Sequence, residues 1–231
     1  MALYAIADLH LPLGIDKPMD IFGRKWHNYV DRLHDNWQRI IKEDDCVVIP
    51  GDFSWATYLE EATKDFEFLH NLNGKKLLLK GNHVYWWTTK AKLDRFVSEK
   101  GFFDIEFIHN NSYIYENTAI CGTRGWIHPN WENFGSDDKK IYEREVTRLE
   151  LSLKSVANCD EVFVFTHYPP ISAQQENNAF RQIMKKYNVA ACYYGHLHAA
   201  AQHSAFCGEA DGIRYRLVAA DYLDFVPLRI K

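Results

Sequence analysis

The arrangement of apolar residues constrains the fold of this chain more than any other feature of its sequence. Five short runs, rich in branched or aromatic residues, have the character of buried strands: residues 3–7, 46–50, 76–80, 162–166 and 190–194. Between them, apolar residues recur every three or four positions, as on the buried face of a helix, in residues 30–41, 59–69 and 142–156. Strands therefore alternate with helices, which predicts an α/β layered architecture with substantial parallel pairing.

Two segments in the middle of the chain depart from this alternation. Residues 112–126 predict two short strands around an Asn-Thr turn, and hence a second, partly antiparallel sheet. Residues 125–140 are polar and aromatic without a clear period, which favours an irregular functional or mobile loop whose acidic run at 136–140 is solvated. The 231 residues contain no internal repeat or linker, so we expect a single domain over residues 1–231.

Charge and cysteine content argue against several classes of protein. The 27 basic and 31 acidic residues leave a net charge of -4, which disfavours a large nucleic-acid surface. The five cysteines form no C-x-x-C pair and are expected to be reduced, buried thiols. The N-terminus lacks a basic region before its apolar residues, and no run approaches the roughly 18 apolar residues of a membrane span. We therefore expect a soluble cytoplasmic protein.

Residue types that bind metals follow all five apolar runs. They are Asp8 and His10, Asp52, Asn82 and His83, His167, and His196 and His198. The strand ends of an open α/β sheet converge on the crevice where ligands bind, so we expect these side chains to meet. Buried carboxylates and imidazoles are costly unless they are paired or bind an ion. A metal centre is therefore favoured over a coincidence of loop and cap residues.

The same residues give the sequence a specific family resemblance. In order, it contains DLH at 8–10, GDFSW at 51–55, GNHVYWW at 81–87, THYPP at 166–170 and GHLH at 195–198. This series resembles the motifs of the metallophosphoesterases, the calcineurin-like phosphoesterase superfamily, and covers the chain from Asp8 to His198. The resemblance implies a metal-dependent phosphatase fold, a four-layer α/β/β/α sandwich of two mixed sheets flanked by helices.

The resemblance also implies two divalent metal ions and a role for each motif residue. One ion would be held by Asp8, His10, Asp52 and His198. The other would be held by Asp52, Asn82, His167 and His196, so that Asp52 would bridge the two ions. His83 matches the family's histidine that is not a metal ligand, and it would act as general acid or position the substrate.

The chemistry of these side chains is consistent with those roles. Carboxylate, amide and imidazole ligands without a thiolate suit Mn, Fe or Zn better than Mg or Ca. Two such ions about 3.5–4 Å apart lower the pKa of a bridging water, orient it for in-line attack and neutralise phosphoryl oxygens. A protonated His83 would donate to the departing oxygen. We therefore expect metal-assisted hydrolysis of a phosphate mono- or diester.

Three residues are candidates for substrate contacts. Arg124 has the fork geometry that fits a phosphate, with a structural ion pair as the alternative. Trp126 and His128 lie in the irregular segment that could cover the site, and a core position is the alternative for Trp126. The expected partner is a phosphorylated small molecule or a phosphodiester, and the sequence identifies no protein partner.

Departures from the family pattern bear on the substrate. Ser/Thr protein phosphatases continue the second motif as GD-x-x-DRG, whereas Trp55 and Ala56 stand here in place of the Asp and Arg. Many members have an acidic residue after the GNH histidine, where this chain has Val84. A carboxylate that supports His83 would therefore come from elsewhere or be missing. We expect an enzyme unlike a typical Ser/Thr protein phosphatase.

The tryptophans near the motifs offer a different kind of substrate contact. Trp55, Trp86 and Trp87 could supply apolar or stacking contacts, which favours phosphodiesters or small aromatic phosphates. The alternative to an enzyme is a non-catalytic metal-binding scaffold or a protein-interaction module on the same fold.

Overall fold

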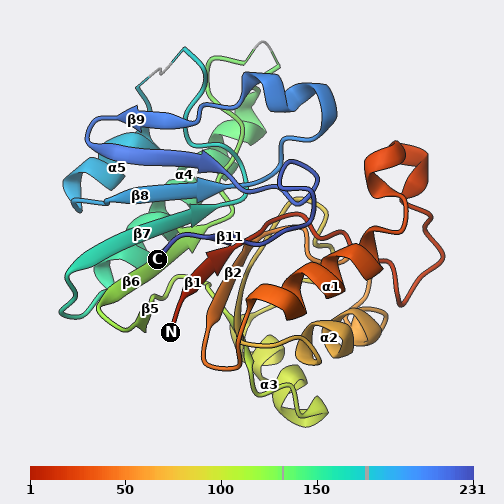
Figure 1. Cartoon of the computed structure of the whole chain (residues 1–231). Coiled ribbons are helices and arrows are strands. Elements are labelled where there is room, and N and C mark those ends of the chain that lie inside the picture. The colour runs from red at the N-terminus through yellow and green to blue at the C-terminus, as the bar shows by residue number, and fades with distance from the viewer. Residues whose placement is uncertain (132, 175–176) are drawn as a thin grey trace.

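Two β-sheets pack face to face in the computed structural model, which describes residues 1–131, 133–174 and 177–231 (Figure 1). The first sheet has the spatial order β11 (Leu228–Arg229), β1 (Leu3–Ala5), β2 (Cys46–Pro50), β3 (Lys75–Leu79) and β4 (Ile105–Phe107). The second has the order β5 (Tyr113–Tyr115), β6 (Thr118–Thr123), β7 (Glu161–Thr166), β8 (Ala191–Tyr194), β10 (Ile213–Leu217) and β9 (Gly208–Ala210). The inner strands of each sheet run parallel, and antiparallel strands β11, β5 and β9 lie at the edges, so both sheets are mixed.

Helices cover the outer face of each sheet (Figure 1). The first sheet packs against α1 (Tyr29–Ile40), α2 (Thr63–His70) and α3 (Lys90–Lys100), and the second against α4 (Ser136–Lys154) and α5 (Ala179–Lys186). Side chains along β1 point alternately to the two faces of its sheet. Leu3 and Ala5 face the other sheet, and Tyr4 faces the helices. The predicted four-layer α/β/β/α sandwich is therefore confirmed.

Most of the elements predicted from apolar patterning are present. All five apolar runs form strands, and the predicted hairpin is β5 and β6, with Tyr115 paired to Thr118. Its turn consists of Glu116 and Asn117, so the expected Asn-Thr turn is one residue too far along the chain. The helix expected from residue 59 begins only at Thr63, and the helices α3 and α5 and the strands β4, β9, β10 and β11 were not predicted.

The irregular loop expected at residues 125–140 is shorter than predicted. The acidic run at 136–140 is the first turn of α4, where Asp138 accepts hydrogen bonds from the backbone N–H of Gly135 (2.9 Å) and from Trp126 Nε1 (3.0 Å). Carboxylates at a helix N-terminus are stabilised by its dipole. The irregular segment therefore ends at residue 135, and residue 132 lies outside the described residues.

The cysteines also differ in part from expectation. All five are free, but only three are buried; Cys159 is half-buried and Cys207 is exposed. Among the described residues, no helix combines the length and the apolar character needed to cross a bilayer.

Close contacts between strand ends bring the carboxylates of Asp8 and Asp52 against backbone amides from other strands. The loop after β8 passes so near Asp8 that a Cβ at Gly195 would lie 2.6 Å from Ala7 Cβ and would also overlap the Asp8 carboxylate. The loop after β3 is equally tight, because a Cβ at Gly81 would lie 2.5 Å from the backbone nitrogen of Asp52. Glycine at these two positions is therefore a condition for the geometry of both carboxylates.

We expect Gly195→Ala to destabilise the protein by about 1–3 kcal/mol, the usual cost of overpacking a rigid interior. The added methyl has no flexible neighbour that can move aside. Gly208→Ala in β9 is the control, because its new Cβ would lie 3.4 Å from the nearest atom, an ordinary contact. Chemical denaturation of both variants measures the difference. Equal unfolding free energies for the two would contradict the role assigned to the close approach at Gly195.

Candidate metal centre

Eight motif residues from both sheets meet at one end of the sandwich. The structure brings together the residues after β1, β2, β3, β7 and β8: Asp8, His10, Asp52, Asn82, His83, His167, His196 and His198. Four of them have left-handed backbone angles, with φ of 60° at Asp8, 46° at both His10 and Asp52, and 72° at His196. Such angles cost about 1–3 kcal/mol in residues other than glycine and cluster at functional sites. The sharp turns aim these side chains at one another.

The first half of the cluster consists of Asp8, His10 and His198. Each offers one ligand atom, and these atoms lie within 4.8 Å of one another. His10 Nε2 is 3.4 Å from His198 Nε2, and it is 4.0 Å from Asp52 Oδ2. Two imidazole nitrogens and carboxylate oxygens therefore converge on one point.

The second half is centred on His167. Asp8, Asp52 and His167 form another group with ligand atoms within 4.8 Å of one another. His167 Nε2 is 3.4 Å from Asp52 Oδ2, 2.5 Å from Asn82 Oδ1 and 3.2 Å from His196 Nδ1. Asp52 thus lies near residues of both halves, and Asp8 is the residue that the two groups of ligand atoms share.

Burial shifts the pKa of the two carboxylates and of two imidazoles in the cluster. Burial raises the pKa of Asp8 and of Asp52, which means that their negative charges are costly in place. Burial also lowers the pKa of His10 and His167 well below the usual value, so both imidazoles are neutral, the form that binds metals. Asp8 Oδ1 is buried and accepts no hydrogen bond from any described residue. The imidazole nitrogens that face one another, the two buried carboxylates and the unsatisfied Asp8 Oδ1 are all suited to binding a divalent cation.

Asp221 completes the cluster, although the sequence analysis missed it. It is buried after β10, and its Oδ1 lies 2.8 Å from His198 Nδ1, while Gln202 donates to its other oxygen at 2.8 Å. Burial alone would lower the pKa of His198, but the hydrogen bond and charge of Asp221 raise it to about 9. A carboxylate on the far nitrogen fixes the ring, so that Nε2 faces His10. The apolar run before Asp221 was a usable signal, because the other predicted ligands also follow strands.

His83 lies at the rim of the cluster. Its ring centroid is 4.7 Å from that of Trp55 and 5.9 Å from that of His10, and its backbone N–H donates to Asp52 Oδ1 at 2.9 Å. Burial lowers the pKa of His83, while the charge of Asp52 opposes this effect. Within the described residues, no side chain forms a hydrogen bond with its ring, so the carboxylate expected to support it is missing there.

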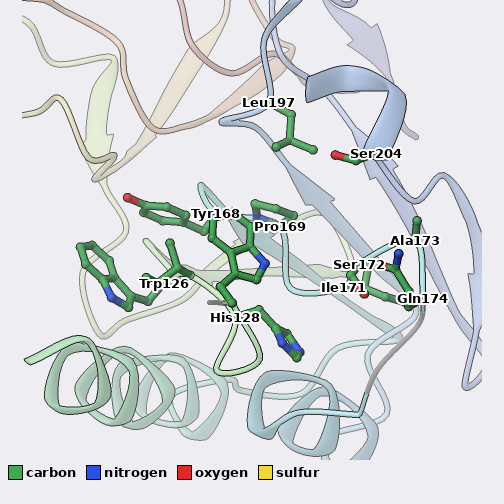
Figure 2. A pocket seen from close by; sticks show the side chains of 12 residues that line it. Trp126, His128, Tyr168, Pro169, Ile171, Ser172, Ala173, Gln174, Leu197 and Ser204 are labelled. Carbon is green, nitrogen blue, oxygen red and sulfur yellow. The ribbon is translucent and has the colours of Figure 1, made fainter. Parts of the chain in front are cut away.

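The three predicted substrate contacts do not lie together at His83. The Arg124 guanidinium is 3.4 Å from Glu145 Oε1 and stacks 4.4 Å above the Trp126 ring, an arrangement that matches the structural ion pair. Trp126 and His128 line a cavity of about 180 Å³ (Figure 2). Tyr168 also lines this cavity, and its tilted ring packs against that of His196 with centroids 4.1 Å apart, which places the cavity beside the second half of the cluster.

A second cavity, of about 200 Å³, adjoins the first half of the cluster. We call it the His83 cavity and define it by its lining residues: His10, Met19, Phe22, Trp26, Trp55, His83, His198 and Ala199. Of the expected tryptophan cluster, only Trp55 reaches it. Trp86 is instead buried against Phe53 and Phe66.

Comparisons with known proteins agree with this arrangement. The chain is similar in fold to a phosphopantetheinyl hydrolase from Mycobacterium tuberculosis, with 13% identity and a TM-score of 0.58 over 99% of this chain and 95% of that one. A protein of unknown function from Aquifex aeolicus gives 15% identity and a TM-score of 0.52, over the same shares of the two chains. No curated protein matches this sequence. The family model for calcineurin-like phosphoesterases matches residues 1–200, and the chain therefore belongs to the calcineurin-like phosphoesterase family.

Proposed function

We propose that this protein is a metal-dependent phosphoesterase that hydrolyses phosphate mono- or diesters with two divalent ions of the Mn, Fe or Zn type. The observation that carries the proposal is the convergence of two ligand groups on two buried carboxylates, one of which has an unsatisfied oxygen. Membership of a phosphoesterase family supports the reaction class. Asp8, His10, Asp52 and His198 would hold one ion. The second would be held by Asp52, Asn82, His167 and His196.

In the proposed hydrolysis, Asp221 and His83 have different roles beside the ions. The ions, when bound, supply the positive charge that activates a water and stabilises the phosphoryl oxygens. Asp221 holds the His198 ring in place through its Nδ1 hydrogen bond. His83 faces the same space and carries no competing hydrogen bond from the described residues, so its ring N–H is available to the oxygen that leaves phosphorus.

The expected result of metal removal is a complete and reversible loss of activity. Purified protein should contain up to two divalent ions per chain, and a chelator should abolish hydrolysis of nitrophenyl mono- and diesters. Mn²⁺ should restore the rate, because neither His83 nor Asp221 can replace the lost charge. Elemental analysis and a chromogenic assay on the same sample test this. Bound metal without turnover on any ester would instead support the non-catalytic scaffold.

Substituting the two central carboxylates tests the position of Asp52. We expect Asp52→Asn to lower the occupancy of both ions and to reduce kcat/KM by more than about 100-fold, beyond the usual effect of an outer-shell partner. Asp8→Asn should mainly affect one ion. Metal content and rate are measured for both variants. If Asp8→Asn empties both positions and Asp52→Asn only one, the bridging role belongs to Asp8.

The chain should be a poor phosphoprotein phosphatase. Trp55 and Ala56 supply no cation at the second motif, and Arg124 is engaged by Glu145. Loss of a charge-assisted bidentate contact weakens binding of a doubly charged monoester more than that of a diester. We expect kcat/KM of the Mn-loaded protein to be lower for a phosphoserine peptide than for nitrophenyl esters. A peptide favoured by tenfold or more, about 1.4 kcal/mol, would contradict this expectation.

A further inference from the structure

We propose that the His83 cavity binds an uncharged apolar group of the substrate, an aryl or short branched alkyl group attached through the ester oxygen next to His83. This inference rests on the proposed function and names the class of ester that the site takes. The enzyme would release an apolar alcohol or phenol and phosphate, or a phosphomonoester where the substrate is a diester.

The position of the cavity sets which part of the substrate can enter it. His10 and His198 belong to the first half of the cluster, and both line the cavity. His83 lines it as well, with its ring 5.9 Å from that of His10. An ester whose phosphorus lies at the cluster and whose departing oxygen lies at His83 can therefore place the carbon atoms next to that oxygen in this cavity.

The walls of the cavity are apolar. Apart from the three imidazoles, they consist of Met19, Phe22, Trp26, Trp55 and Ala199, and within the described residues no Asp, Glu, Lys or Arg side chain lines it. Two further donors belong to lining residues, the indole nitrogens of Trp26 and Trp55, and that of Trp55 is already directed at Met19 Sδ, 2.7 Å away. A sugar or a charged group would lose its water there without gaining partners, which is costly.

Two of the wall residues, Trp26 and Trp55, pack against neighbouring side chains, which preforms that part of the cavity. Trp26 is buried and packs edge-on against Tyr29 and Phe225, with ring centroids 5.1 and 5.3 Å away. The Trp55 ring stacks on His10 at 4.5 Å and carries the Lys17 ammonium 3.2 Å from its centre. A preformed apolar site binds without first ordering its side chains.

The volume limits the size of the group. An apolar protein cavity of about 150 Å³ binds benzene. The His83 cavity, at about 200 Å³, therefore has room for one aromatic ring or a branched alkyl group of similar size. A peptide chain on both sides of a phosphorylated residue does not fit, which agrees with the absence of the cation expected in a phosphoprotein phosphatase.

Two neighbouring residues of one short 3-10 helix, Asp20–Phe22, provide a matched pair of variants. Phe22 lines the cavity and is 52% exposed, whereas Ile21 is 70% exposed and is not part of the lining. Because neither side chain is buried, Phe22→Ala and Ile21→Ala should both fold. Each removes one exposed apolar side chain, and only Phe22→Ala opens a wall of the cavity.

Binding of two phosphonates separates the cavity from the metal centre. Phenylphosphonate and methylphosphonate present the same charged group, but only the first carries a ring. Calorimetry with the Mn-loaded protein should give a Kd at least about tenfold lower for phenylphosphonate, because burial of a ring removes apolar surface from water. Phe22→Ala should reduce this ratio by about threefold or more, and Ile21→Ala should leave it unchanged. Quenching of tryptophan fluorescence by phenylphosphonate gives a second readout that requires no turnover.

The outcomes distinguish this inference from the function on which it rests. If both phosphonates bind with equal affinity, or if Phe22→Ala and Ile21→Ala behave alike, the assignment of the cavity is overturned while the metal centre stands. If neither phosphonate binds after Mn loading, the proposed phosphoesterase site itself is wrong. A preference for phenylphosphonate that falls only in Phe22→Ala supports the assignment.

Discussion

Two carboxylates, Asp8 and Asp52, are buried among the strand ends of two sheets, and the geometry of this end of the molecule depends on them. Each accepts a backbone N–H from a loop of a different strand, from His196 and His83 respectively, both at 2.9 Å. Those hydrogen bonds require the close approach that glycine permits, and the turns carry left-handed backbone angles. The free-energy cost of the buried charges and of the left-handed turns is balanced when a cation neutralises the carboxylates. His10 and His167, which are neutral, can bind that cation.

The surroundings of this cluster are asymmetric. Beside its first half lies the apolar His83 cavity, and beside its second half lies the cavity lined by Trp126, His128 and Tyr168 (Figure 2). Arg124, a candidate for a phosphate contact, pairs with Glu145, which also accepts from Arg148 at 2.9 Å. Recognition in the proposed enzyme therefore depends on the ions for the phosphoryl group and on apolar walls for the rest of the ester.

The sequence was sufficient for the five strands that precede the motif residues and for the convergence of those residues, because parallel strands place the residues that follow them at one end of a sheet. It did not reveal Asp221, because Arg214 and Arg216 interrupt the apolar pattern of β10 and leave only the short apolar run at 217–220 as a signal. The role of Arg124 depends on Glu145, which reaches it only through the packing of α4. The His83 cavity is lined by Trp55 together with Phe22 and Trp26, which lie in a segment without apolar periodicity. No local sequence pattern therefore predicts the cavity.

The most direct test of the central claim is anomalous X-ray diffraction from a crystal of the Mn-loaded protein. The account predicts two peaks about 3.5–4 Å apart, the usual separation in two-metal sites. One should lie among Asp8, His10 and His198, the other among Asn82, His167 and His196, with the Asp52 carboxylate between them. A single peak, or peaks away from these residues, would contradict the dinuclear centre.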